Sequence, residues 1–211
     1  MIKIRPHALH RIMTDPKSRK ADELSVGALT YCRELAKQIV YGYSPQISSK
    51  YIEKGLIVGS QSIALYNEVF FCDLKKNIER RHNQWLSGEA DIVLPEKTLD
   101  LKSSWSLQTF PATVEDADNT EYEWQGRGYM MLWNKPVHEV AYCMVSTPDE
   151  LIGFEDSSIH YVDEIPPELR ITRIHYERDK VLEDKIICKA ELAQKQIALE
   201  VERIKDEHKA A

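Results

Sequence analysis

The 211-residue sequence lacks most of the features that mark secreted and membrane-bound proteins. Its four cysteines are widely spaced and form no Cys-x-x-Cys pair, which argues against a disulfide framework and a structural zinc site. No apolar run approaches the roughly 20 residues that cross a bilayer, and residues 1–13 lack the zones of a signal peptide. We therefore expect a cytoplasmic protein with reduced thiols.

Several catalytic signatures are absent as well. The sequence has no G-x-x-x-x-G-K-[ST] loop, which excludes an ATP-driven motor of that type. It also has no H-E-x-x-H zinc motif and no G-x-S-x-G nucleophile motif. A formal net charge of −6 counts against a large basic surface for nucleic acid. A local basic groove could still lie on an acidic body, and carboxylates that bind a metal contribute to the negative count.

The hydrophobic pattern predicts alternating groups of helices and strands. This order favours an α/β fold in which a central mixed β-sheet is flanked by helices. We expect one domain over residues 1–211, with N-terminal helices in 1–71, a catalytic sheet core in 78–177 and a C-terminal helix in 178–208. Helical spacing marks residues 6–14, 24–41, 60–71, 119–134 and 180–208, and strand alternation marks 83–94, 98–105, 138–146 and 171–176. The C-terminal helix could pack on its own domain, which we favour, or form an oligomer contact.

A charged hairpin stands out within the predicted sheet. Asp91 and Asp100 lie on strands joined by the short turn "PEKT", so their carboxylates can converge, as Mg²⁺ binding requires. Lys102 shares a strand face with Asp100, and the carbonyl of Leu101 could add a ligand. An equally open alternative is a surface turn in which Lys102 pairs with one aspartate, because buried charges without a partner are costly.

A second polar constellation lies in the helix predicted at residues 119–134. Gln125 and Tyr129 are four residues apart and therefore share one helix face, where both side chains can form hydrogen bonds. Taken alone, this pair fits a polar stripe on an ordinary helix, with Trp124, Met131 and Leu132 in the core.

Together these stretches resemble a known nuclease superfamily. "GEAD" at 88–91, "DLK" at 100–102 and "QGRGY" at 125–129 resemble the ordered GxxD, (D/E)xK and QxxxY motifs of PD-(D/E)XK nucleases. More narrowly, the chain resembles RecB-type and lambda-exonuclease-type (YqaJ-like) phage recombination nucleases over all but about the last 30 residues. The resemblance implies the restriction-endonuclease-like fold of that superfamily.

The resemblance also implies a divalent-metal-dependent deoxyribonuclease. Asp91, Asp100 and the Leu101 carbonyl would hold Mg²⁺, for which Mn²⁺ could substitute. Lys102 would be the catalytic lysine, and Gln125 with Tyr129 would support the site or contact the DNA backbone.

The implied activity is 5′-to-3′ resection of linear double-stranded DNA ends for single-strand-annealing recombination. Its implied partners are DNA and a single-strand annealing protein, in a homotrimeric ring within the bacterial host cytoplasm. Two alternatives stay open: a RecB-type nuclease on single strands or DNA ends, and a catalytically weak DNA-binding recombination protein.

One departure from the family pattern bears on activity. Family members usually carry a glutamate in a G-x-x-x-E pattern before the hairpin, whereas here Gly55 is followed by Gly59. Glu68 would lie on the opposite helix face from Gly59, and Glu53 would precede the helix. Alternatively, Gly59 begins the helix with Ser60 as its N-cap. We therefore expect a weakened second metal position and reduced activity.

A second departure lies at the N-terminus, where relatives often place a phosphate-binding serine. In "IRPHALHR", Arg5 and Arg11 could contact phosphate, as could His7 and His10 when protonated. A slightly favoured alternative is that these side chains cap and solvate a short helix. The basic run at residues 80–82 likewise fits a DNA groove or, more often, a solvated strand entry.

Overall fold

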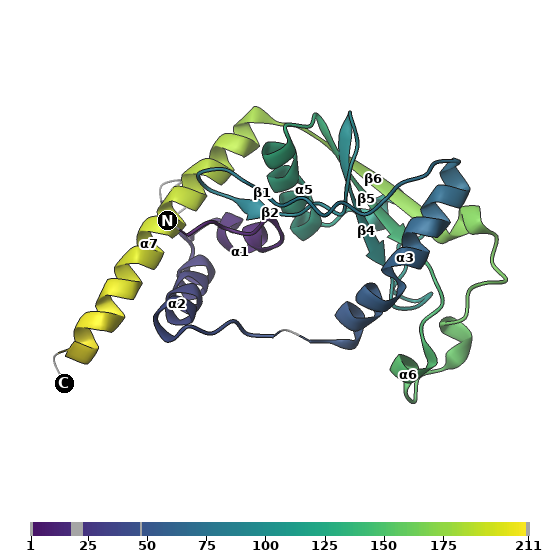
Figure 1. Cartoon of the computed structure of the whole chain (residues 1–211), viewed down its shortest axis with the longest axis horizontal. Coiled ribbons are helices and arrows are strands. Elements are labelled where there is room, and N and C mark those ends of the chain that lie inside the picture. The colour runs from purple at the N-terminus through teal and green to yellow at the C-terminus, as the bar shows by residue number, and fades with distance from the viewer. Residues whose placement is uncertain (1, 18–22, 47, 210–211) are drawn as a thin grey trace.

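A four-stranded mixed sheet forms the centre of the molecule (Figure 1). The computed structural model describes residues 2–17, 23–46 and 48–209. The sheet order is β3-β4-β5-β6; β4 and β5 are parallel, and the other neighbouring pairs are antiparallel. The strands of this sheet are β3 (Ile92–Val93), β4 (Lys97–Ser103), β5 (Val137–Cys143) and β6 (Ile171–Glu177), and a separate two-stranded ribbon pairs β1 (Arg81–His82) with β2 (Ser87–Gly88).

Helices cover both faces and one end of the sheet. They are α1 (Leu9–Met13), α2 (Val26–Tyr41), α3 (Lys50–Phe70), α4 (Val114–Ala117), α5 (Thr120–Trp133), α6 (Asp149–Ile152) and α7 (Lys180–Lys209). Short 3₁₀ turns occupy Pro6–Ala8, Ser157–Ile159 and Pro167–Arg170. Within the described ranges, no helix is long and apolar enough to cross a membrane.

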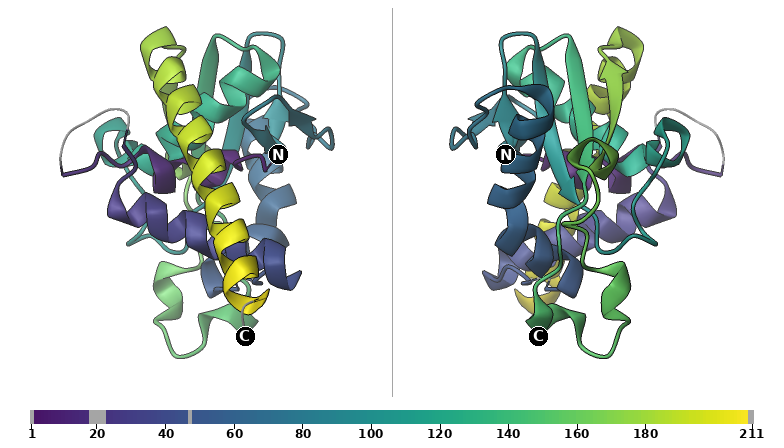
Figure 2. Two further views of the ribbon diagram at one scale, coloured as in Figure 1. Left: turned by 90° about the vertical axis from the view of Figure 1, so that its left-hand side faces the viewer. Right: turned by 90° about the vertical axis from the view of Figure 1, so that its right-hand side faces the viewer.

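Strand alternation assigns the two faces of the sheet to different helices. Leu99 of β4 packs with Tyr66 of α3 on one face, whereas Val140 of β5 packs with Met130 of α5 on the other. The parallel connection from β4 to β5 passes through α5, as a crossover between parallel strands requires. Figure 2 shows α3 against the sheet in its right-hand view. The predicted mixed sheet flanked by helices is therefore confirmed.

A second core lies between the N-terminal helices and α7. Leu9, Ile12, Cys32, Ile186 and Ile197 are completely buried there. In Figure 1, α7 runs past α1 and α2 on the side of the molecule opposite α3. The favoured prediction, that the C-terminal helix packs on its own domain, agrees with this core.

The helix predicted at residues 60–71 is longer than expected. α3 begins at Lys50, and the Ser49 hydroxyl accepts a hydrogen bond from the backbone N–H of Ile52 at 3.3 Å. Ser60 is therefore not the N-cap, Gly59 lies inside the helix, and Glu53 belongs to its first turn. Each interior glycine costs roughly 1 kcal/mol relative to alanine. Burial of the opposite helix face offsets that cost. The spacing of apolar residues around Gly59 did not predict this burial.

Candidate active site

The predicted aspartates converge beside the β3–β4 hairpin. Asp91 directly precedes β3, and Asp100 lies in β4, which pairs with β3 in antiparallel register. The backbone N–H of Leu101 donates a hydrogen bond to Asp91 Oδ2 at 3.2 Å. This bond fixes the Asp91 carboxylate next to β4.

Asp100 is the buried centre of this group, with only 3% of its surface exposed. Its Oδ2 forms an ion pair with Lys102 Nζ at 2.6 Å and accepts a hydrogen bond from Gln125 Nε2 at 3.2 Å. The alternative of a surface turn correctly placed Lys102 beside an aspartate, but Asp100 itself lies inside the protein.

Gln125 and Tyr129 complete the group from α5. Gln125 Nε2 also donates to Tyr129 Oη at 3.3 Å, and Lys102 Nζ donates to Gln125 Oε1 at 3.4 Å. Both α5 side chains are buried against the sheet. The polar pair therefore lies on a buried helix face, whereas Trp124, Met131 and Leu132, which the alternative placed in the core, are only partly buried.

The two carboxylates differ in their electrostatic environment. Burial, and then the negative charge of Asp100, raise the pKa of Asp91 well above its usual range. Burial alone would raise the pKa of Asp100 too, but the Lys102 ammonium and a hydrogen bond with Asp91 hold it below its usual range. Two adjacent carboxylates that cannot both ionise share a proton, and a bound cation can replace that proton.

Behind this group, α5 packs unusually close to β5. A Cβ atom on Gly126 would lie 2.0 Å from the His138 ring, so only glycine fits there. His138 is fully buried, is hydrogen-bonded through Nδ1 to Thr98 Oγ1 at 2.8 Å, and has a pKa lowered by burial to about 4. The sequence motifs did not single out His138. Gly126 and Gly128 in "QGRGY" were the one local sign that this helix packs closely against a neighbouring element.

An open pocket of about 460 Å³ adjoins Asp91 on the α3 side. Gly59 lines this pocket, and a Cβ added there would have no other atom within 4 Å. Glu68 is exposed and does not line it, as predicted from the helix geometry. In the described part of the chain, no three acidic, histidine or cysteine residues cluster as a metal site. The site therefore has a carboxylate pair without a third acid.

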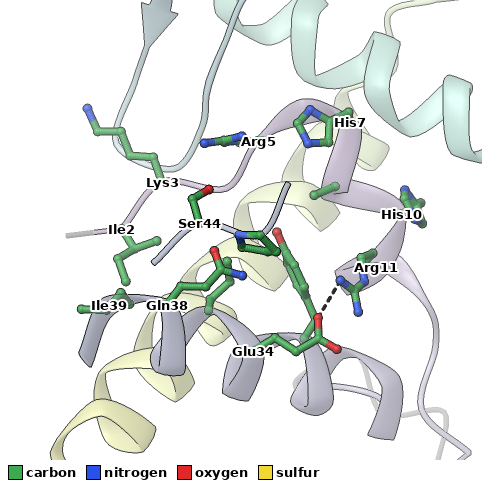
Figure 3. A pocket seen from close by; sticks show the side chains of 14 residues that line it. Ile2, Lys3, Arg5, His7, His10, Arg11, Glu34, Gln38, Ile39 and Ser44 are labelled. Atoms are coloured by element: carbon green, nitrogen blue, oxygen red, sulfur yellow. Dashed lines mark ion pairs between the residues drawn. The ribbon is translucent and has the colours of Figure 1, made fainter. Parts of the chain in front are cut away.

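A second pocket, of about 650 Å³, lies beside the N-terminal segment (Figure 3). Lys3 lines it together with Arg5, His7, His10 and Arg11, the four residues considered above for phosphate contact or helix capping. Arg11 pairs with an acid of α2 at 2.8 Å, whereas Arg5 has no ion pair with a described acid and makes no side-chain cap. His7 lines this pocket, and burial, then Arg5, and then Lys102 lower its pKa.

The basic run at residues 80–82, which enters β1, has a different setting. Arg80 pairs with Glu89 at 2.8 Å, and Arg81 pairs with Glu79 at 2.7 Å. His82 is exposed. Because both arginines already form ion pairs with glutamates, a solvent-exposed segment leading into a strand is a better interpretation of this run than a DNA-binding groove.

Comparison with known proteins gives a clear result for solved structures. No family model and no curated protein matches the chain. A phage-related exonuclease from Haemophilus somnus 129PT is 32% identical, with 96% of each chain covered and a TM-score of 0.90. The chain belongs to the family of phage-related exonucleases.

A more distant structure has the same fold. The alkaline exonuclease LHK-Exo from Laribacter hongkongensis is 16% identical, with 99% of this chain and 95% of that chain covered and a TM-score of 0.72. LHK-Exo has also been solved in complex with dAMP. The 32% identical phage-related exonuclease confirms the predicted resemblance to PD-(D/E)XK nucleases of the lambda-exonuclease type, and LHK-Exo shares the fold.

Proposed function

We propose that this exonuclease hydrolyses phosphodiester bonds of linear double-stranded DNA with the help of Mg²⁺. The observation that carries the proposal is the hydrogen-bonded set of Asp91, Asp100, Lys102, Gln125 and Tyr129. A buried lysine–aspartate pair next to a second carboxylate is poorly explained as a stabilising device, because buried ion pairs contribute little net stability.

The donor set fits one divalent cation. Mg²⁺ is usually held by one or two carboxylates together with water and substrate phosphates. Asp91 and Asp100 are close enough to hydrogen-bond each other, and the Leu101 carbonyl is the third proposed ligand. When bound, the ion would polarise the phosphate and lower the pKa of a water molecule. Mn²⁺ could substitute.

Three side chains of the protein have separate roles in the proposed reaction: Lys102, Gln125 and Tyr129. Lys102 places a positive charge beside the aspartates, where negative charge would develop on the phosphate. Gln125 holds both Asp100 and Lys102 by hydrogen bonds, so it fixes their relative position. Tyr129 stays protonated because burial raises its pKa, and its hydroxyl can therefore donate to the DNA backbone.

We also propose that the N-terminal pocket guides DNA phosphates toward this site. Its unpaired Arg5, with Lys3 beside it, concentrates positive charge on a chain whose net charge is −6. We propose 5′-to-3′ digestion, a homotrimeric ring around the DNA and a single-strand annealing protein as partner. The family resemblance supports the direction of digestion, the ring and the annealing partner.

A second candidate function follows from Gly59. Without a carboxylate at this position, the protein could bind DNA as a catalytically weak recombination factor. The open space around Gly59 supports this candidate, because nothing else in the pocket replaces an acid there. A RecB-type nuclease would instead prefer single strands or flaps over long duplex.

A digestion assay separates these functions. Linear duplex DNA with a 5′ phosphate is incubated with Mg²⁺ or Mn²⁺ and either the parent protein or Gly59→Glu, with closed circular and single-stranded DNA as parallel substrates. We expect slow digestion of linear duplex by the parent, sparing of circles, and faster digestion by Gly59→Glu.

Each other outcome has a distinct meaning. Cleavage only by Gly59→Glu would identify a nuclease fold disabled at one position. Preference for single strands would favour the RecB-type activity. No cleavage by either protein, with retained binding in a gel-shift assay, would contradict the nuclease proposal and favour the DNA-binding factor.

A further inference from the structure

The pocket beside Asp91 contains one positive side chain. Of its lining residues, only Lys76 and Asp91 are charged. The α3 side contributes only apolar residues, serines and glycines: Ile52, Gly55, Leu56, Gly59, Ser60, Ser62 and Ile63. Ser62 is already occupied, because its hydroxyl is hydrogen-bonded to Ser103 at 2.9 Å.

The backbone around Lys76 is held at both ends. Asn67 of α3 exchanges two hydrogen bonds with Leu74, accepting from its N–H at 2.8 Å and donating to its carbonyl at 3.1 Å. On the other side, the Asn77 N–H donates to the Asp91 carbonyl at 2.7 Å, and the Asn77 side chain donates to the Ala90 carbonyl at 3.0 Å. Lys76 therefore enters the pocket from a segment anchored to both α3 and Asp91.

Lys76 has no ion pair with any described acid. Its neighbour Lys75 differs in this respect, since Lys75 Nζ lies 3.5 Å from Asp73 Oδ2. Lys75 also does not line the pocket. Two adjacent exposed lysines thus differ both in pairing and in access to the space beside Asp91.

We propose that Lys76 binds a phosphate of the DNA strand beside Asp91 and is a substrate-contacting residue of this exonuclease. The inference rests on the proposed function, since it requires DNA at the carboxylate pair. A phosphate that approaches Asp91 from the α3 side meets no acid at Gly59, and it meets one ammonium group at Lys76. Lysine serves such anions as a compact point charge.

This placement gives the site two lysines with different settings. Lys102 is partly buried and paired with Asp100, so its charge is already partly compensated. Lys76 is exposed and unpaired among the described residues, so its full charge is available to the phosphate. An acid at position 59 would hold a second metal ion, whose positive charge would face the phosphate. The ammonium group of Lys76 supplies part of that positive charge from the same side of the pocket.

The test measures DNA binding without cleavage. Fluorescence polarisation in EDTA follows a labelled 5′-phosphorylated duplex across a series of salt concentrations, for the parent protein, Lys76→Ala, Lys76→Arg and the matched control Lys75→Ala. We expect Lys76→Ala to weaken binding about 3- to 10-fold and to reduce the slope of log K against log salt by about 1, the loss of one phosphate contact. Lys76→Arg should keep the slope, and Lys75→Ala should resemble the parent.

The outcomes distinguish this inference from the proposed function. If the parent binds DNA and Lys76→Ala changes affinity and slope no more than Lys75→Ala does, the Lys76 assignment is wrong and the proposed function stands. If the parent neither binds DNA here nor cleaves it in the digestion assay with Mg²⁺, the proposed function fails and the inference fails with it. Circular dichroism spectra of all variants should coincide, because Lys76 is exposed.

Discussion

At the scale of single residues, Asp100 determines how the site is arranged. Its carboxylate is buried and receives both the Lys102 ammonium and the Gln125 amide. Removing either member of a buried charged pair leaves the other uncompensated, so a substitution here affects both chemistry and stability.

We predict that Asp100→Asn and Lys102→Ala each reduce cleavage of linear duplex DNA by at least about 100-fold, the usual loss when one electrostatic group is removed from an active site. Asn keeps the size of Asp100 and its acceptor oxygen, so the fold should remain. Activity is measured by release of labelled nucleotide, and folding by thermal unfolding. Full activity in either variant would remove these residues from the active site.

A second residue-scale prediction concerns the contact between Gly126 and His138. Gly126→Ala should destabilise the protein by about 1–3 kcal/mol, because the added methyl group overlaps the imidazole. Adding His138→Ala should recover part of that loss, since it removes the overlapping ring. Urea unfolding of both single variants and the double variant measures the coupling. Purely additive effects would show that the contact does not limit packing.

The sequence motifs predicted that the five hydrogen-bonded side chains of the proposed site lie together, whereas the residues around them were not predicted. Spacing alone placed Asp100 with Lys102, and Gln125 with Tyr129, on common faces, and the structure joins the two pairs by hydrogen bonds. Lys76 carries no local signal, because its position depends on hydrogen bonds to a segment 14 residues later. Such contacts exist only after the chain has folded.

At the scale of elements, α3 is the helix that local patterns described least well. Gly59 and Ser60 fitted a helix start, yet the helix runs from Lys50 to Phe70. The reason lies partly in Lys54, whose fully buried ammonium donates to three carbonyls, those of Ser104, Trp105 and Val145, at 2.6–3.1 Å. This contact ties the first half of α3 to the ends of β4 and β5, and no periodicity predicts it.

We predict that Lys54→Ala lowers the free energy of unfolding by about 3 kcal/mol, because three buried carbonyl groups lose their donor. Lys37→Ala, an exposed position on α2, serves as the control and should stay within about 0.5 kcal/mol of the parent. Urea unfolding gives both values. Equal stability of the two variants would mean that water replaces the ammonium at no cost.

At the scale of the whole molecule, the carboxylate pair couples stability to pH and to metal. Burial, and then the charge of Asp100, raise the pKa of Asp91 from 3.8 in the unfolded chain to about 8 in the folded protein. Between these values the folded state binds more protons. The free energy of unfolding of the metal-free protein should therefore fall as the pH rises through this window.

Stabilisation of the folded protein by Mg²⁺ should instead increase as the pH rises, because Mg²⁺ binding requires the deprotonated carboxylate. We predict that the rise in melting temperature caused by Mg²⁺ is larger at pH 8 than at pH 6, by about 2–4 °C for each kcal/mol of added binding. Differential scanning fluorimetry measures this shift, and Asp91→Asn should abolish the difference. Equal shifts at both pH values would contradict a metal bound by Asp91.

The core between the N-terminal helices and α7 also has a consequence for biosynthesis. Its buried residues come from both ends of the sequence, from Ile4 to Ala36 and from Ile186 to Val201, with Leu86 between them. A nascent chain emerges from the ribosome N-terminus first, so α1 and α2 expose their apolar faces until α7 has been made. The sheet with α3 and α5 can form earlier, and the last helix then closes the molecule. Until that moment, we expect the exposed apolar faces of the nascent exonuclease to make it prone to aggregation and to attract chaperones.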